Sequence, residues 1–336
     1  MAARQPAWWT SGVIALTLLA VLDVGLRQWQ PWPARLPENF SAAYFERVVD
    51  DAGAKDARVL IVGDSAIWGY HLYTNESLGS RLALLLPSER VLNLSIQGGS
   101  PVNTYVAISE ALRRGLRPRL VVFNLNLKEF DPEDRSYDRI LPAFAPAARR
   151  LSSTDQKSFI YQAGGETRTA RFVERFWALY RYRVDIRQSV FGDADFASRI
   201  ASFASTLTGR TAREDALNAP TPDKYLGAYD LTPLGSDNIS LQYTRETLRL
   251  LKDRGITAVV YLTPTNHGLL HDTIDVPEYD ANLRALGRVA RSYGARLYNL
   301  DRAFPQKAFI DNDHLDAAAT AALAQNVATM IEASLR

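Results

Sequence analysis

A serine and a histidine in this chain stand in settings that suit nucleophilic catalysis. Ser65 ends the tripeptide Gly63-Asp64-Ser65, directly after an apolar run, which predicts its hydroxyl at the point where a strand stops and a helix begins. His314 follows Asp311 by three residues, and a turn can place that carboxylate on the far ring nitrogen. A histidine that takes the serine proton, oriented by a carboxylate, makes the hydroxyl a nucleophile for a carbonyl carbon.

Other residues compete for these roles. Asp313 is a rival carboxylate for His314, although a direct neighbour usually points elsewhere, and an Asp-x-x-His segment alone also fits a capping turn. The combination with Ser65 favours catalysis. His267 and His271 are four residues apart, a spacing that fits a metal site on a helix, pocket lining or a structural role. The interpretation adopted here needs no metal and no other cofactor.

Acyl transfer also requires donors for the oxyanion that develops. The Ser65 N–H at a helix start is one candidate. Gly98, after the second apolar run, offers another backbone N–H, and Asn126, after the third, offers a side-chain amide. Taken singly, these residues also fit a turn glycine and a strand-end asparagine. The residues expected to line the substrate pocket are Asp64, Trp68, His71 and His267, with Trp68 either stacking on a sugar face or packing.

The elements that position these residues alternate along the chain. Continuous apolar runs predict strands at 58–63, 90–94, 119–125, 257–263 and 296–300. Helical patterns cover about 76–86, 101–115, 240–254, 278–293 and 316–335. Such alternation predicts a doubly wound α/β domain with a parallel sheet. Ligands bind such sheets beyond the carboxyl ends of the strands, where Ser65 is expected.

One segment interrupts the alternation. Residues 131–237 separate the third and fourth strands by far more than a normal crossover. They contain an arginine- and aromatic-rich helical stretch at 168–187 and a polar stretch at 207–237. We interpret the segment as an inserted lid or docking element. Its helix fits a membrane surface, an anionic glycan or a partner protein, and equally a plain surface helix with its aromatic side chains packed inward.

The N-terminal residues predict a membrane anchor. Residues 8–25 are apolar over roughly the length that crosses a bilayer core. Trp8, Trp9, Trp29 and Trp32 flank them as an aromatic belt would. No clear cleavage site follows, which favours an uncleaved signal anchor with the main domain outside the cytoplasm. A buried helix of a soluble protein is the alternative. Asp23 is unusual in such a span and marks a helix end or a contact with another helix.

The chain is expected to divide into an anchor at 1–30, a stalk and short leading helix at 31–55, and a hydrolase-like domain at 56–336 that contains the insertion 131–237.

Composition narrows the classes of function that the chain could have. A net charge of +2 gives no reason to expect nucleic acid as a partner. The absence of cysteine excludes disulfides and a thiolate nucleophile.

Taken together, the motifs resemble the four blocks of the SGNH/GDSL hydrolases. Gly63-Asp64-Ser65, Gly98, Asn126 and Asp311-x-x-His314 follow the order of that superfamily. The resemblance implies a flavodoxin-like sheet, a triad of Ser65, His314 and Asp311, and an oxyanion hole from Ser65, Gly98 and Asn126. The third block departs from the family pattern, since Asn124-Leu125-Asn126-Leu127 replaces Gly-x-Asn-Asp. Residue 67 is Ile, so the lipase-type Gly-x-Ser-x-Gly elbow is absent and an α/β-hydrolase is disfavoured.

The anchor and the insertion resemble membrane-tethered SGNH proteins of envelope-polymer modification, such as DltD-like and O-acetyltransferase accessory proteins. This resemblance implies a periplasmic domain on the inner membrane, a polysaccharide or glycan acceptor and a membrane-bound O-acyltransferase as partner. The predicted activity is therefore O-acyl transfer to the glycan, or ester hydrolysis, through an acyl-enzyme. The alternatives are a non-catalytic glycan-binding scaffold for such an acyltransferase and an esterase directed at lipids.

Overall fold

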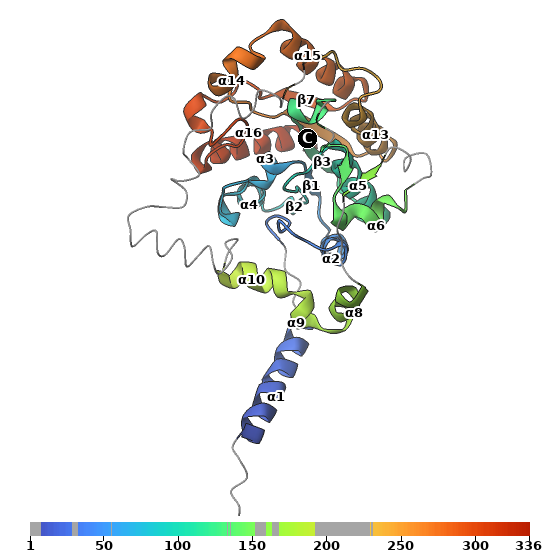
Figure 1. Cartoon of the computed structure of the whole chain (residues 1–336), viewed down its shortest axis with the longest axis vertical. Coiled ribbons are helices and arrows are strands. Elements are labelled where there is room, and N and C mark those ends of the chain that lie inside the picture. The colour runs from blue at the N-terminus through green and yellow to red at the C-terminus, as the bar shows by residue number, and fades with distance from the viewer. Residues whose placement is uncertain are drawn as a thin grey trace, which may run out of the picture.

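A five-stranded parallel sheet forms the centre of the computed structural model, which describes residues 8–28, 33–54, 56–132, 134, 136–151, 159–162, 168–191, 229 and 231–336 (Figure 1). Its strands are β1 (Val59–Val62), β2 (Val91–Asn93), β3 (Leu120–Leu125), β6 (Thr257–Leu262) and β7 (Arg296–Asn299). Their spatial order is β2-β1-β3-β6-β7, and every pair is parallel. This is the 2-1-3-4-5 order of flavodoxin-like sheets, so the predicted doubly wound α/β fold is confirmed.

Helices cover both faces of the sheet because alternate strand residues point to opposite sides. Leu60 and Val62 of β1 belong to the larger core, while Val59 and Ile61 belong to the smaller one. The larger core is closed by α2 (Ala42–Ala54), α5 (Pro101–Arg113), α13 (Ile239–Asp253) and α15 (Pro277–Ser292). The smaller is closed by α3 (Ser65–Trp68), α4 (Leu78–Leu85) and α16 (Ala317–Leu335).

Burial varies across the sheet. Every residue of β1 and β3 is buried, as a central parallel strand requires. β7 differs from the prediction of a strand buried on both sides, since none of its four residues is fully buried. β7 lies at one edge of the sheet and pairs with β6 alone, whereas β2 at the other edge is fully buried.

The described part of the insertion adds a second, two-stranded sheet and several helices. Its elements are β4 (Arg139–Ile140), η3 (Pro142–Phe144), α6 (Ala145–Ala148), β5 (Ile160–Tyr161), α8 (Arg168–Phe176), α9 (Ala178–Arg181) and α10 (Arg183–Phe191). The single helical stretch predicted at 168–187 is broken into three, because Trp177 has extended backbone angles and Tyr182 leaves the helical region. Residues 207–228 lie outside the described part, and the predicted domain boundaries stay a prediction.

The shorter connections complete the chain. They are η1 (Thr74–Glu76), η2 (Leu127–Phe130), α14 (His267–Ile274) and η5 (Gln306–Ala308). Helix η2 directly follows β3 and α14 follows β6, so both begin near the carboxyl edge of the sheet. That edge also receives the Ser65 end of α3, because β1 and β3 run side by side in register.

The N-terminal helix α1 (Trp8–Arg27) projects from the rest of the molecule (Figure 1). Among the described residues it is the single helix whose length and hydropathy suit a bilayer crossing, over Thr10–Arg27. Its side chains are almost all exposed along that length. Trp29, Trp32 and the side chains of Trp8 and Trp9 lie outside the described part of the chain.

Candidate active site

The turn between β1 and α3 sets the position of Ser65. Gly63 is required there, because a Cβ would lie 2.2 Å from Oδ1 of Asn124 and 2.6 Å from the side chain of Ile67. Asp64 then caps α3 by accepting the N–H of Ala66 at 2.8 Å. The hydroxyl of Ser65 is left at the first position of the helix, beyond the carboxyl end of the strand.

His314 bridges this serine and a carboxylate. Its Nε2 lies 2.8 Å from Oγ of Ser65, although 249 positions separate the two residues. Its Nδ1 lies 2.8 Å from Oδ2 and 2.9 Å from Oδ1 of Asp311. The structure therefore brings Ser65, His314 and Asp311 into the continuous hydrogen-bonded chain that a serine nucleophile needs.

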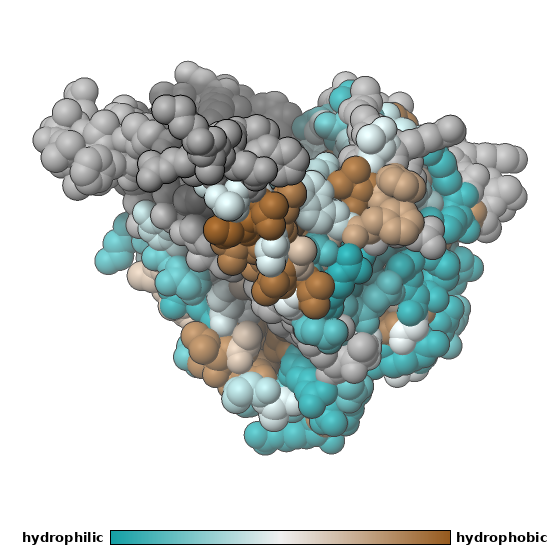
Figure 2. All heavy atoms as spheres, turned by 90° about the horizontal axis from the view of Figure 1, so that it is seen from below, coloured by the Kyte–Doolittle hydropathy of each residue, from teal (hydrophilic) through white to brown (hydrophobic). Residues whose placement is uncertain are grey.

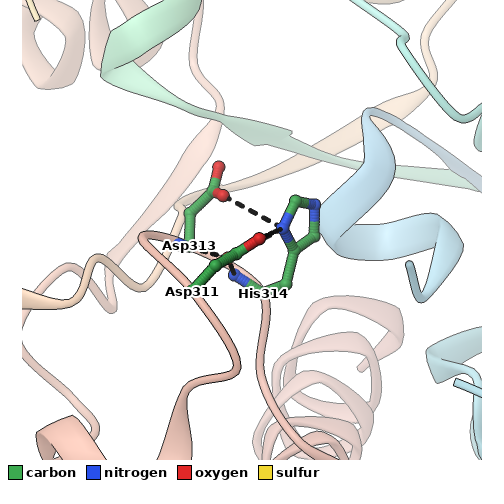
Figure 3. Close-up of side chains that lie close together, drawn as sticks. All are labelled: Asp311, Asp313 and His314. Atoms are coloured by element: carbon green, nitrogen blue, oxygen red, sulfur yellow. Dashed lines mark hydrogen bonds and ion pairs between the residues drawn. The ribbon is translucent and has the colours of Figure 1, made fainter. Parts of the chain in front are cut away.

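Two carboxylates face the same edge of the His314 ring (Figure 3). Besides Asp311, Oδ1 of Asp313 lies 3.3 Å from Nδ1. Asp311 makes the closer contact, and it also accepts the N–H groups of Asp313 and His314 at 3.1 and 2.9 Å. Burial favours a neutral Asp311, but the hydrogen bonds from the His314 ring and these N–H groups outweigh it and lower the pKa of Asp311 to about 2.

The two carboxylates also shift the base. Burial favours the neutral imidazole, and His314 is only 7% exposed. The negative charge of Asp313 and the hydrogen bond and charge of Asp311 outweigh burial, so the pKa of His314 lies above its ordinary value. The ring is thereby suited to hold the proton that it takes from a serine.

Sequence reasoning missed the cation behind the histidine. Lys128, in η2, forms an ion pair with Oδ2 of Asp313, whose side chain is completely buried. Burial lowers the pKa of Lys128, but the Asp313 carboxylate dominates and holds it well above its ordinary value. A cation three residues after the end of β3, at the carboxyl edge of the sheet, was the available signal. Its neighbour Glu129 is buried as well, and burial and the charge of Asp64 raise the pKa of Glu129.

Asn126 does not occupy the position predicted for an oxyanion donor. Its Nδ2 donates to Oδ2 of Asp64 at 3.0 Å and to Oδ2 of Asp313 at 2.5 Å. Both amide hydrogens are therefore directed at buried carboxylates, and Asn126 itself is 1% exposed. The amide joins the two carboxylates across the floor of the site, and no donor is left for a substrate.

Two backbone donors remain from the predicted set. Within the described part of the chain, the N–H groups of Ser65 and Gly98 have no hydrogen-bond acceptor. Gly98 has φ +68 and is exposed, with open space around its α-carbon. Its neighbour Gly99 instead donates to Ile96 at 3.1 Å. The Ser65 and Gly98 N–H groups are accordingly the candidate oxyanion donors.

Two residues predicted to line the pocket serve the interior instead. Asp64 is 3% exposed, and its oxygens accept the amides of Asn124 and Asn126 as well as the helix N–H. Trp68 is also buried: its indole donates to the Leu36 carbonyl at 2.6 Å, and the Arg35 guanidinium lies 3.8 Å from its ring centroid. Neither side chain is available to contact a sugar, because both are buried and their polar groups are hydrogen-bonded within the protein.

The other two predicted lining residues occupy different places. His71 is exposed at φ +65, and its ring centroid lies 6.4 Å from that of His314, with Tyr70 at 5.0 Å. These two aromatic rings stand at the mouth of the site. Both nitrogens of His267 are bonded to carboxylates, Asp275 at 2.7 Å and Asp301 at 2.8 Å, so His267 belongs to a separate polar network.

The donor set favours hydrogen bonding over metal binding. Asp311, Asp313 and His314 each place a ligand atom within 4.8 Å of the others, which a cation could in principle use. However, Nδ1 of His314 is already bonded to Asp311, and the positive charge beside Asp313 is supplied by Lys128. A metal would have to displace both the ring proton and the ammonium group.

Comparison with known proteins gave structural likenesses alone. No protein-family model matches the chain, and no curated protein matches it. Among solved structures, it is similar to a GDSL-like lipase from Bacteroides thetaiotaomicron, with 10% identity, 87% of this chain and 100% of that chain covered, and a TM-score of 0.40. It is also similar to Est24, a carbohydrate acetylesterase from Sinorhizobium meliloti, with 10% identity, 82% of this chain and 99% of that chain covered, and a TM-score of 0.39. A protein of Bacteroides fragilis provisionally described as an acylhydrolase has 10% identity, with 89% of this chain and 100% of that chain covered, and a TM-score of 0.45. The function proposed below therefore rests on the Ser65 site itself.

Proposed function

We propose that this chain is a serine ester enzyme of the SGNH/GDSL type, anchored in a membrane and directed at an O-acylated or acyl-accepting glycan. The observation that carries the proposal is the single imidazole that contacts Ser65 through Nε2 and Asp311 through Nδ1. This arrangement is what a hydroxyl nucleophile requires and what a glycan-binding scaffold does not need.

The geometry suggests a two-step reaction. Oγ of Ser65 attacks the ester carbonyl while Nε2 of His314 takes its proton, and Asp311 stabilises the imidazolium that results. The N–H groups of Ser65 and Gly98 donate to the oxyanion. His314 then returns the proton to the leaving alkoxide, and the acyl group stays on Ser65. Water or a sugar hydroxyl, deprotonated by the same ring, releases it.

The anchor supports an extracytoplasmic site on the inner membrane. Helix α1 has the composition of a span, and one short anchor before a large domain is the usual signal-anchor layout. The partners proposed with this location are a glycan acceptor and a membrane-bound O-acyltransferase. A lid over the site would favour transfer by excluding water. The described helices α8 to α10 of the insertion pack on α1 and α2 rather than over Ser65, so they give no reason to prefer transfer to hydrolysis.

Covalent labelling tests the nucleophile. The full chain is incubated with p-nitrophenyl acetate or a fluorophosphonate and its intact mass is measured, alongside Ser65→Ala and His314→Ala. We expect one adduct on the natural sequence, none on Ser65→Ala and strongly slowed formation on His314→Ala. A folded natural protein that acquires no adduct would contradict the enzyme and leave the scaffold alternative.

The acceptor is tested on the labelled enzyme. Acetyl-enzyme is prepared from p-nitrophenyl acetate and then mixed with buffer or with a polysaccharide that bears free hydroxyls. Faster loss of the acetyl mass with polysaccharide, together with acetate found on the sugar, defines a transferase. Equal loss in both mixtures defines an esterase.

A further inference from the structure

The described helices of the insertion form a layer between the membrane-type helix and the α/β domain (Figure 1). Helix α9 lies directly above the carboxyl end of α1, with α8 and α10 on either side. Because these helices come from the middle of the chain and α1 from its start, their contact is a tertiary interaction. It shows what surface surrounds the end of the anchor.

Two side chains of α1 fix this contact. Asp23 accepts the backbone N–H of Leu179 at 3.0 Å, so a carboxylate of α1 caps the amino end of α9. Arg27 binds Asp23 at 2.8 Å and donates to the carbonyl of Phe176 at 3.1 Å. The acidic residue that is unusual for a span thereby has a partner on each side, and its charge is neutralised.

The same layer is tied to the α/β domain on its opposite side. Asp185 of α10, buried to 4% exposure, accepts the Tyr44 hydroxyl and the Arg47 guanidinium of α2, each at 2.7 Å. Glu174 of α8 pairs with Arg183 at 2.5 Å within the layer. The layer is consequently attached to α1 on one side and to α2 on the other, so these contacts fix its position along the axis of α1.

Three aromatic residues remain on the surface of this layer. Phe172, Phe176 and Trp177 are 65%, 56% and 47% exposed. The ring centroids of Phe172 and Phe176 lie 4.8 Å apart. Phe176 ends α8 just before α9 begins, and its carbonyl accepts the hydrogen bond from Arg27. We call these three residues the aromatic wedge. Figure 2 shows the molecule from the side on which α1 projects; hydrophobic residues gather near the middle of this view, and hydrophilic residues lie around much of its edge.

The depth of the wedge follows from helix geometry. The 20 residues of α1 span about 30 Å, which matches the hydrocarbon thickness of a bilayer. Asp23 lies four residues before Arg27, so its α-carbon lies about 6 Å before the end of α1, and its side chain reaches Leu179 from there. Helices at a membrane surface bury their apolar side about 5–10 Å deep, and aromatic residues favour that layer.

We propose that the aromatic wedge is seated in the interfacial layer of the bilayer that α1 crosses, on the side of its carboxyl end. The occupant of the exposed apolar surface is lipid, because the Phe176 carbonyl is bonded to Arg27 at the end of α1, which puts the exposed rings next to the end of the proposed span. The inference rests on the membrane span included in the proposed function, and it assigns the layer α8 to α10 a second attachment to the membrane.

Site-specific fluorescence tests this seat, and the chain suits the method because it has no cysteine. Phe172→Cys and Phe176→Cys are labelled with an environment-sensitive fluorophore in the full chain, reconstituted in phosphatidylcholine–phosphatidylglycerol nanodiscs. Nitroxide lipids that quench at the headgroup, shallow or deep level report depth. Leu84→Cys in α4, 80% exposed and outside the wedge, is the matched control, and Leu18→Cys in α1 reports the span itself.

The expected result is blue-shifted emission at positions 172 and 176, quenched several-fold more by headgroup and shallow nitroxides than position 84. Position 18 should be quenched most by the deep nitroxide. If position 18 is quenched while positions 172 and 176 behave like position 84, α1 crosses the bilayer but the aromatic wedge is not in the interfacial layer, which points to a protein partner for the aromatic surface. If position 18 is not quenched, neither the membrane crossing of α1 nor the interfacial position of the wedge holds. The Ser65 labelling assay is independent of either outcome.

Discussion

Lys128 and Asp313 form a buried ion pair beside His314, the residue proposed to take the proton of Ser65. The Asp313 side chain has no solvent exposure, and its second oxygen lies 3.3 Å from Nδ1 of His314. The imidazole therefore stands next to two carboxylates, one of which is already neutralised. The balance between Asp311, Asp313 and Lys128 decides how strongly the ring holds a proton.

The pH dependence of Ser65 labelling follows from this balance. Attack requires a neutral His314, and the pKa of His314 lies above its ordinary value of 6.5. Labelling by a fluorophosphonate is expected to fall as pH decreases through a midpoint above 6.5, while Asp311, with a pKa of about 2, stays ionised. Labelling rates measured from acid to neutral pH check this, and a midpoint below 6.5 would refute it.

Removing either member of the pair should move that midpoint in opposite directions. Asp313→Asn removes a negative charge beside the ring, so the pKa of His314 falls and the midpoint moves to lower pH. Lys128→Gln removes a positive charge that lowers this pKa, so the midpoint moves to higher pH. Arg81→Gln, outside this set of charges, serves as the control. Shifts of the same sign would contradict the assignment.

The pair should also be coupled in stability. Lys128→Met leaves the Asp313 carboxylate buried without its cation, which is expected to lower the free energy of unfolding by about 3–5 kcal/mol. The double variant Lys128→Met/Asp313→Asn leaves neither charge, and it should recover most of the loss. Urea unfolding of the three variants measures the coupling. A double variant as unstable as the sum of the singles would show two independent residues.

Asp311 is expected to act through the orientation of the ring. Asp311→Asn replaces an acceptor at Nδ1 by an amide, which favours the wrong tautomer and lowers the rate constant of acylation by up to about 10⁴-fold. Circular dichroism should be unchanged, since Asp311 is partly exposed in a loop. Acylation of Asp311→Asn at the natural rate would assign the orienting role to Asp313.

Chelation should leave the reaction intact. Asp311, Asp313 and His314 are close enough to hold a cation, but Nδ1 of His314 is already bonded to Asp311 and Oδ2 of Asp313 is paired with the Lys128 ammonium. Dialysis against EDTA is expected to change neither the labelling rate nor the unfolding midpoint. A loss of labelling that zinc or magnesium restores would overturn this assignment.

Sequence patterns were sufficient for the fold and for the residues that contact Ser65. Continuous apolar runs located the five strands of the central sheet, since a parallel strand buried on both sides is mostly apolar, but they did not show that β7 is only partly buried. Ser65 and His314 were found because their types and neighbours limit them to few roles. The chemistry of the triad stays a prediction until Ser65 is labelled.

What the sequence did not reveal depends on where side chains point. Asn126 and Asp64 belong to the motifs singled out in the sequence, yet their polar groups bond to each other inside the protein. Lys128 would be read as a surface lysine, because its burial arises only when η2 folds against the loop of Asp313. Trp68 is predicted from the sequence to line the pocket, where it would stack on a sugar or pack, but Arg35 from the leading segment covers its ring.

The distance in sequence between Ser65 and His314 has a consequence for synthesis. The proposed nucleophile is made 249 positions before its base, and the loop of His314 leads into α16. Until that loop has been made, the emerging protein holds a serine without a proton acceptor, which is chemically inert. Reactivity can begin only when the loop has docked, so a product that stops before His314 does not attack esters around it. The order of the chain thus sets a time order, in which the base must be in place before Ser65 can react.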